Sequence, residues 1–243
     1  MYNANVAKCN KIQTKIFGGR KMEVKNLQKE AAKGCTQKVK ELIEQGANVT
    51  ANNNKALRSA VAKGHDKTVR LLIDHGADVT ACNNQALRIA TKKNYEKTIS
   101  VLLEKGADAA CCDNEPLLIA VSNGNKRIAK MLIEKGADVT AHDNEAFIIS
   151  VENGDLRMAK MLVAKGADVK ARDNYALKFA SENKNINMAM MLIKNGAEYN
   201  ECFTIGVRSI IDGKITIKEF KEELKEAKEE REFLEHFYED YYK

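Results

Sequence analysis

The chain has 243 residues, of which 40 are Lys or Arg and 34 are Asp or Glu, so its formal net charge is +6. Hydrophobic residues make up 44% of the sequence and aromatic residues 6%, and proline occurs once. No apolar run approaches the ~18 residues of a membrane-spanning helix, which argues against a helical membrane protein, a collagen-like chain and a low-complexity chain. Scarce proline and aromatic residues favour helices over sheets.

Residues 1–21 form a basic N-terminal leader that we expect to be poorly ordered. Its five basic residues are Lys8, Lys11, Lys15, Arg20 and Lys21, and it contains no acidic residue. Such a charge would support salt-sensitive, unspecific binding of nucleic acid or an anionic surface. The leader has neither a recognisable nucleic-acid-binding motif nor the apolar stretch of a secretory signal.

The cysteine pattern predicts an intracellular chain. The six cysteines are Cys9, Cys35, Cys82, Cys111, Cys112 and Cys202. None belongs to a Cys-x-x-Cys pair, and two of them are adjacent, which favours neither a disulfide framework nor a zinc site. We therefore expect a reducing compartment, the cytoplasm.

A period of 30 residues organises the chain from about residue 22 to residue 201. The dipeptide Gly-Ala recurs without insertion at Gly46, Gly76, Gly106, Gly136, Gly166 and Gly196. Each of these glycines follows an apolar cluster with helical spacing, so we expect it to end a helix with a positive φ angle and to be a structural residue. A second marker with the same period occupies positions Gly34, Gly64, Asn94, Gly124, Gly154 and Lys184. We expect it to be the turn between two helices, and lysine to make the last of these turns strained.

Each period predicts a helix, a turn, a second helix and a loop. In the second unit, residues 54–63 predict the first helix, for which Asn54 offers an N-cap, and residues 66–75 predict the second. Helices of this length lie below the ~12–15 residues at which isolated helices become marginally stable. The units must therefore bury their apolar faces against one another as a solenoid.

The period also sets the expected boundaries. Six units are predicted over residues 22–201, namely 22–51, 52–81, 82–111, 112–141, 142–171 and 172–201. Residues 202–243 are expected to form a degenerate seventh unit that caps the array and ends in a long helix. The aromatic residues of that helix either cover the last repeat or dock another chain.

Residues 56–79 carry the pattern A-L-x-x-A-x-x-x-G-H-x-x-x-V-x-L-L-I-x-x-G-A-D-V, which resembles the ankyrin repeat. The resemblance implies an all-α helix-turn-helix solenoid. The usual ankyrin unit has about 33 residues, whereas this one has 30, and the missing residues come from the loop between Ala81 and Ala86. Asp/Asn pairs such as Asn83-Asn84 occupy the shortened loop and favour local turns. We therefore predict a shortened hairpin without regular β pairing. Such Lys/Asn-rich units are similar to ankyrin proteins of giant DNA viruses and intracellular bacteria, which would place the chain in a host cytoplasm as a host-interaction protein.

The resemblance implies a non-catalytic scaffold or adaptor that binds another protein on the concave face of the array. The candidate partner-binding residues are Lys55, Arg58, Lys63, Arg88, Lys92, Lys93, Glu115, Asp143, Glu145 and Tyr175. They form a basic half followed by a more acidic half, which would direct the encounter with a polar partner. Two alternatives are nucleic-acid or anionic-surface binding through the leader, and a substrate-recruiting subunit of a ubiquitin ligase. We expect a monomer with no small-molecule substrate.

No pattern of catalytic, cofactor-binding or metal-binding residues is present, so we expect no enzymatic activity and no cofactor. Residues 212–220 resemble the second half of a calcium-binding EF-hand loop. In that register, however, Arg208 and Ile210 occupy the first and third ligand positions, where calcium needs oxygen ligands. We therefore predict no calcium site.

Overall fold

The structure is a computed structural model, and it describes residues 26–198, 207–209, 212–213, 216, 218–219 and 222. The chain divides into two compact units, residues 1–142 and residues 143–243, which are treated one at a time. The basic leader, the C-terminal aromatic residues and most of the expected capping unit lie outside the described residues.

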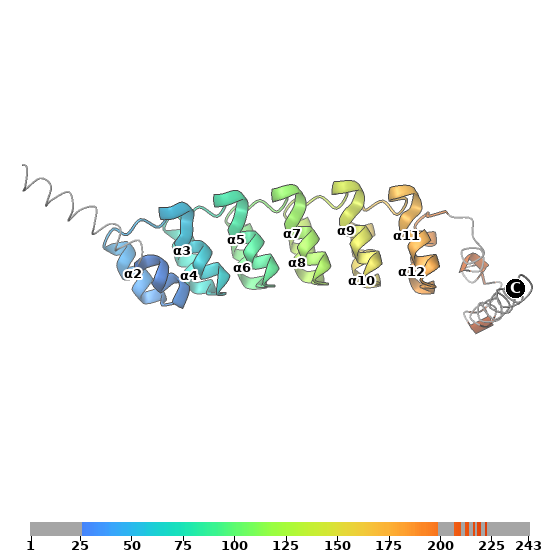
Figure 1. Cartoon of the computed structure of the whole chain (residues 1–243), viewed down its shortest axis with the longest axis horizontal. Coiled ribbons are helices and arrows are strands. Elements are labelled where there is room, and N and C mark those ends of the chain that lie inside the picture. Colours follow the sequence, from blue (N-terminus) through green and yellow to red (C-terminus); the bar gives the residue numbers. More distant parts are fainter. Residues whose placement is uncertain are drawn as a thin grey trace, which may run out of the picture. The chain divides into compact units, whose positions relative to one another are not determined.

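Short helices follow one another at a constant interval through the first unit (Figure 1). Residues 26–33 are helical and precede α2 (Thr36–Glu44). The remaining helices of this unit are α3 (Ala51–Ala62), α4 (Asp66–Asp74), α5 (Ala81–Lys92), α6 (Glu96–Glu104), α7 (Cys111–Ser122) and α8 (Lys126–Glu134). We call α3, α5 and α7 the first helices of their repeats, and α4, α6 and α8 the second helices. Neighbouring first helices pack side by side, as do neighbouring second helices.

The second unit continues the same alternation. Its helices are α9 (Ala141–Glu152), whose first turn contains the division between the units, α10 (Leu156–Ala164), α11 (Ala171–Glu182) and α12 (Ile186–Lys194). Here α9 and α11 are first helices, and α10 and α12 are second helices. No strand occurs among the described residues of either unit. The predicted all-α fold and the absence of β pairing in the shortened loops are thus confirmed.

The turn between the two helices of a repeat always needs one residue in the left-handed conformation. Gly34 has φ = 73° and Gly64 has φ = 72°, and Asn94 adopts φ = 57° at the equivalent place. Lys184 adopts φ = 51°, so the last turn keeps the shape of the others although its residue has a Cβ atom. A left-handed residue other than glycine costs about 1–2 kcal/mol, so the strain expected at this position is present.

The Gly-Ala dipeptides end the second helices with a Schellman motif. In α4 the Gly76 N–H donates to the Ile73 carbonyl at 2.9 Å, and the Ala77 N–H donates to the Leu72 carbonyl at 3.0 Å. Gly76 has φ = 90°, which glycine reaches without a steric penalty. Ala77 is buried, so the dipeptide ends the helix and adds a small side chain to the core.

The apolar core of each unit lies between its packed helices. In the first unit Leu57, Leu87 and Leu117 of the first helices are fully buried, as are Leu72 and Leu102 of the second helices. Burial of such a side chain contributes about 1.5–3 kcal/mol. Since the second helices have only nine residues each, this packing rather than intrinsic helix propensity stabilises them.

The shortened loops contain a turn of three consecutive left-handed residues, an unusual run because residues other than glycine normally adopt this conformation singly. The runs are Asn52–Asn54, Cys82–Asn84, Cys112–Asn114, His142–Asn144 and Arg172–Asn174. Asn and Asp tolerate this conformation best among non-glycine residues, which explains the Asp/Asn pairs. The first helices run regularly only after this turn. Pro116, which the span of α7 includes, therefore lies in the first regular turn, where proline is tolerated.

The third residue of each left-handed turn is an asparagine that connects two loops, and we call these residues the latch asparagines. The Oδ1 atoms of Asn54, Asn84, Asn114, Asn144 and Asn174 accept hydrogen bonds from the backbone N–H groups of Asp78, Asp108, Asp138, Asp168 and Glu198. The N–O distances are 2.7–3.2 Å, and each bond spans 24 residues. The expectation that Asn54 caps its own helix is therefore wrong. Its side chain is buried and bonds to the loop after α4 instead, and Asn54 itself has left-handed backbone angles.

Few residues of the expected seventh unit are described. Residues 207–209 are helical, and Val207 is fully buried. Thr216 and Glu219 form a capping box, in which the Glu219 N–H donates to the Thr216 hydroxyl oxygen at 3.2 Å and the Thr216 N–H donates to the Glu219 carboxylate. Hydrogen bonds from the Thr216 backbone N–H, the main cause, and from the Thr216 hydroxyl to the carboxylate lower the pKa of Glu219. They mark the start of a helix in the second half of this segment.

Candidate functional site

The candidate partner-binding residues lie on the first helices or directly after them. In the first unit, Lys55 and Arg58 belong to α3, Arg88 and Lys92 to α5, and Glu115 to α7. Lys63 and Lys93 are the C-cap residues of α3 and α5. We call the surface formed by these side chains and the left-handed turns the first-helix face of the unit.

Arg58 is held in place by neutral groups. Its guanidinium donates to the backbone carbonyls of Asn52 and Asn53 at 3.1 Å each, and to the side-chain oxygen of Gln85 in the next repeat. The two carbonyls belong to the left-handed turn, so the arginine also helps to fix that turn. Because none of these acceptors is charged, the positive charge of Arg58 is not cancelled.

Arg88 occupies the equivalent position one repeat later but has an acidic partner. Its guanidinium forms an ion pair with the Glu115 carboxylate of α7, and both side chains are about one-third exposed. The hydrogen bond to Glu115 raises the pKa of Arg88. Their mutual contribution to stability is about 0–1 kcal/mol because solvent screens the pair. The two charges cancel each other on the first-helix face.

The lysines of this face are uncompensated positive charges, and the exposed Asp113 in the turn before Glu115 is the acidic residue beside them. Lys55, Lys63, Lys92 and Lys93 are exposed, and none of them takes part in an ion pair within the described part of the chain. The first-helix face of the first unit is therefore positively charged around Arg58, while its one acidic candidate residue, Glu115, is neutralised by Arg88.

In the second unit, the acidic candidate residues share one arginine. Arg172, in the left-handed turn within the span of α11, forms an ion pair with Glu145 and lies 3.8 Å from Asp143, measured from its Nε to the carboxylate oxygen Oδ2. The acidic character expected for this half is thus partly neutralised.

Tyr175 bridges two repeats of the second unit. Its hydroxyl donates to the Glu152 carboxylate at 2.8 Å, and its ring stacks on Phe179 with a centroid distance of 6.0 Å. The hydrogen bond to Glu152 raises the pKa of Tyr175. The side chain is therefore ordered by its own repeat and by the one before it.

Of the partners of these side chains, Arg172 was not identified from the sequence. A signal for it is present, because Arg58 and Gln85, Arg88 and Glu115, and Glu145 and Arg172 are each 27 residues apart. This spacing is three residues shorter than the repeat, so it brings a side chain of one first helix next to a residue near the start of the first helix in the following repeat. Opposite charges at this spacing could have predicted the two ion pairs.

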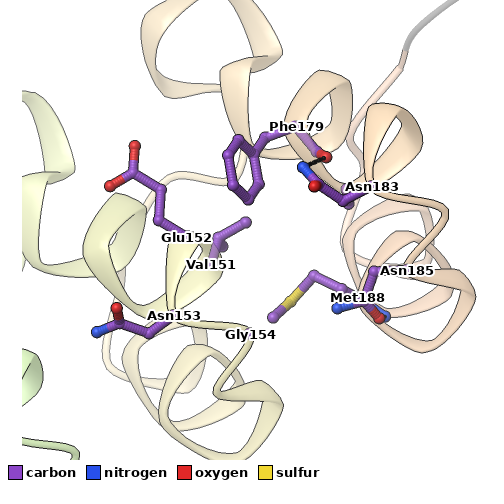
Figure 2. Close-up of a pocket in the computed structure, with 9 residues that line it drawn as sticks. Val151, Glu152, Asn153, Gly154, Phe179, Asn183, Asn185 and Met188 are labelled. Carbon is purple, nitrogen blue, oxygen red and sulfur yellow. Dashed lines mark hydrogen bonds between the residues drawn. The ribbon is translucent and has the colours of Figure 1, made fainter.

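A cavity of about 330 Å³ opens in the second unit at the opposite ends of the first helices. Its walls are formed by the end of α9, the second half of α11 and the start of α12. Figure 2 shows the Phe179 ring, Val151 and the Met188 side chain around this space, with Gly154 beside the end of Met188. Asn183 and Asn185 lie on its polar side, and the Asn183 amide donates to the Phe179 carbonyl at 2.9 Å (Figure 2).

The described residues offer no obvious chemistry. No group of three or more His, Cys, Asp or Glu side chains among them could hold a metal ion. Burial raises the pKa of the Cys111 thiol to about 12, so it stays protonated near neutral pH and is a poor nucleophile. Among the helices of the described ranges, none is both long and apolar enough to cross a bilayer.

Comparison with known proteins agrees with the helical repeat structure. The solved structure of the ankyrin repeat domain of Bcl-3, described as a unique member of the IkappaB protein family, matches with a TM-score of 0.62 and 25% sequence identity. The match covers 71% of this chain and 86% of that chain. A search of curated protein sequences found no significant match.

The family assignment rests on a larger part of the chain. The family model of ankyrin repeats, which spans three copies, matches residues 20–83, 79–143 and 117–201. These matches together cover the whole region in which the 30-residue period and the paired helices occur. The chain therefore belongs to the ankyrin repeat family.

Proposed function

We propose that the chain is a non-catalytic scaffold that binds an acidic segment of another protein on the first-helix face of its first unit. Ankyrin repeats are known as protein-interaction modules, and both the family match and the similarity to the Bcl-3 domain support that role. The four described free cysteines, of which Cys111 and Cys112 are adjacent, support a reducing compartment such as the cytoplasm. We propose that the chain acts as a monomer.

The observation that carries the proposal is the uncompensated positive charge around Arg58. The latch asparagines and the three left-handed residues fix the backbone from which this face projects. Arg58 itself is fixed by neutral acceptors, so it presents its charge without the entropy cost of ordering a mobile side chain on binding. The exposed lysines around it would direct the encounter with an acidic partner.

The test is a capture experiment with two matched charge-reversal variants of the full chain. The face variant carries Lys55→Glu, Lys92→Glu and Lys93→Glu. The control variant carries Lys67→Glu, Lys97→Glu and Lys126→Glu, which are exposed positions on the second helices α4, α6 and α8. Both variants change the net charge equally, and the helix content of each is checked by circular dichroism.

Each tagged chain is incubated with an extract of its native cell, cross-linked, and its bound proteins are quantified by mass spectrometry. We expect a defined set of acidic proteins to be captured at least about tenfold less by the face variant and undiminished by the control variant. Equal capture by all three chains would refute the placement of the interface. Equal loss in both variants would show that net charge alone attracts the captured proteins.

A further inference from the structure

We infer that the cavity beside Gly154 is a second protein-binding site, which takes the ring of a tyrosine or histidine side chain from a partner. This inference rests on the proposed role in protein binding but not on the charged first-helix face. In the first unit, rings of the chain itself fill the equivalent place beside the turn glycine.

The residue directly before α4, His65, and the one before α6, Tyr95, each place a ring on the turn of the preceding repeat. A Cβ atom added to Gly34 would lie 2.6–2.8 Å from atoms of the His65 ring. A Cβ atom added to Gly64 would lie 3.2–3.4 Å from atoms of the Tyr95 ring. In both cases the ring lies directly against the glycine, so the place above the turn is occupied by an aromatic side chain.

The residue directly before α12 is Asn185, and its side chain is used differently. Its Oδ1 atom accepts a hydrogen bond from the Met188 N–H at 3.1 Å, so it caps its own helix. The facing turn residue is Gly154, and no described atom lies within 4 Å of a Cβ atom added there. The cavity therefore corresponds to the place that a His65 or Tyr95 ring fills in the first unit, but no ring of the described chain fills it here.

Asn125, which precedes α8 in the first unit, is also an N-cap residue and provides a useful contrast. The turn it faces contains Asn94 instead of glycine, and the Asn125 amide lies 3.5 Å from the Asn94 side-chain oxygen. There the turn residue itself contributes a side chain. Gly154 contributes none, so the combination of Asn185 and Gly154 leaves the space open.

The walls of the cavity suit the faces of a ring. Val151, Ala180 and Met188 form an apolar floor beneath the cavity and are at most 2% exposed, whereas Phe179 is partly exposed and offers an aromatic edge or face (Figure 2). A methionine sulfur also packs favourably against aromatic rings. A volume of about 330 Å³ is at the lower end of the range of ligand pockets, which suits one ring better than a larger ligand.

A hydrogen-bond acceptor specifies which rings fit. In the first unit, His65 Nε2 lies 3.1 Å from the Ala32 carbonyl at the end of the preceding first helix. The residue equivalent to Ala32 at the cavity is Glu152, the last residue of α9, whose carbonyl receives no hydrogen bond from any described residue. A helix C-terminus attracts donors because its last carbonyls are unpaired. The occupant is therefore a ring that carries an N–H or O–H group.

The site is tested by NMR titration of the full chain with side-chain analogues: p-cresol for tyrosine, 4-methylimidazole for histidine, and toluene as a ring without a donor. The probes of the protein are the Gly154 amide and the Met188 methyl group. We expect saturable shifts of both signals with p-cresol and with 4-methylimidazole, with a Kd of about 1 mM or weaker, and clearly weaker binding of toluene. Absence of saturable shifts would overturn the inference.

Two variants fill the cavity from within the chain. Asn185→Tyr reproduces the residue at position 95, and Asn185→His reproduces the residue at position 65, so at least one of them is expected to fold with unchanged helicity. We expect either variant to weaken p-cresol binding by at least about tenfold. Unchanged binding would place the probe elsewhere and overturn the inference. The Lys55/Lys92/Lys93 face variant is expected to bind p-cresol normally, which separates this site from the proposed interface.

The chain's own C-terminal tyrosines, which lie outside the described residues, are an alternative occupant. Replacement of Tyr238, Tyr241 and Tyr242 by alanine tests them in the full-length chain. If the ring comes from a partner, this variant binds p-cresol as the wild type does. An affinity increase of about tenfold would mean that the chain's own tail competes for the cavity, and would overturn the assignment to a partner.

Discussion

At the scale of single residues, one asparagine in each of the five left-handed turns determines how the loops are joined. The latch asparagines are buried except for the partly exposed Asn174, and each is held in the left-handed conformation and accepts a hydrogen bond from a loop 24 residues further along the chain. An isolated N–H group in such a place would be costly, because a buried donor without an acceptor costs about 1–3 kcal/mol. The same residue therefore fixes the turn and satisfies the backbone of the next loop.

We predict that Asn84→Ala lowers the free energy of unfolding by about 2–4 kcal/mol. The change removes the acceptor of the Asp108 N–H, now at 2.8 Å, and puts an alanine into a left-handed conformation. Urea unfolding followed by circular dichroism measures the effect. The matched variant Asn84→Asp keeps an oxygen acceptor and tolerates the conformation, so it should lose much less. Equal losses in the two variants would contradict the hydrogen-bonding role.

A second prediction at this scale concerns Asp138 in the loop before α9. The Thr140 backbone N–H and then its hydroxyl donate to the Asp138 carboxylate, and both bonds lower its pKa. A lowered folded-state pKa contributes stability above the unfolded value of about 3.9, and this contribution is lost as the pH falls through the folded value.

NMR titration of the Asp138 carboxyl group should therefore give a pKa below the usual value in the wild type. We expect the pKa to rise in Thr140→Ala, which removes the hydroxyl donor but keeps the N–H, and to stay low in Thr140→Ser. A pKa that is the same in all three chains would show that the hydroxyl has no influence.

At the scale of the element, the unit that recurs is a pair of short helices joined by one left-handed residue. The glycine, asparagine or lysine at this place changes the energy of the turn but not its shape. The 30-residue period predicted the helices and these turns because both depend on local pattern. The left-handed runs could not be predicted, because the residue types in the loop do not reveal three consecutive positive φ angles. The latch bonds could not be predicted either, because they join residues 24 positions apart and depend on those angles.

We predict that Lys184→Gly stabilises the chain by about 0.5–1 kcal/mol. Glycine relieves a steric cost of about 1–2 kcal/mol at φ = 51° but loses more conformational freedom on folding. The control Lys178→Gly, at an exposed position inside α11, should instead destabilise the chain by about 1 kcal/mol. Both are measured by urea unfolding. A destabilised Lys184→Gly variant would mean that the lysine side chain makes a compensating contact.

At the scale of the whole molecule, each unit is stabilised by contacts between neighbouring repeats, so the position of a defect matters. Gly46 and Gly106 allow a matched comparison within the first unit. Their φ angles are 89° and 92°, and a Cβ atom added to either meets no described atom within 4 Å. Valine should therefore introduce the same local strain at both places, and any difference in stability reports the coupling to neighbours.

We predict that Gly106→Val lowers the free energy of unfolding by about 1 kcal/mol more than Gly46→Val does. Gly106 ends a repeat that has described neighbouring repeats of the same unit on both sides, whereas Gly46 ends the first described repeat, which has such a neighbour on one side only. Thermal and urea unfolding of both variants provide the measurement. Indistinguishable losses would argue against nearest-neighbour stabilisation.

The binding sites could be predicted only in part, because they depend on contacts between repeats. Exposed Lys and Glu positions followed from the repeat pattern, but the neutralisation of Glu115 by Arg88 depends on side-chain reach between repeats. The cavity is open because Asn185 has no ring, whereas His65 and Tyr95 supply rings at the equivalent positions of the first unit. The substitution is visible in the sequence, but its effect becomes clear only when the glycine opposite it is known.

The first and last residues of each left-handed turn have different roles, one facing solvent and the other holding the framework. Their last residue is a buried asparagine or one close to burial, whereas their first residue is exposed and is Asn52, Cys82, Cys112, His142 or Arg172 in turn. Chemical identity at the outward place has thus diverged while the inward place has stayed the same. An engineer could therefore graft new side chains, labels or recognition chemistry every 30 residues of the sequence and leave the latch hydrogen bonds in place.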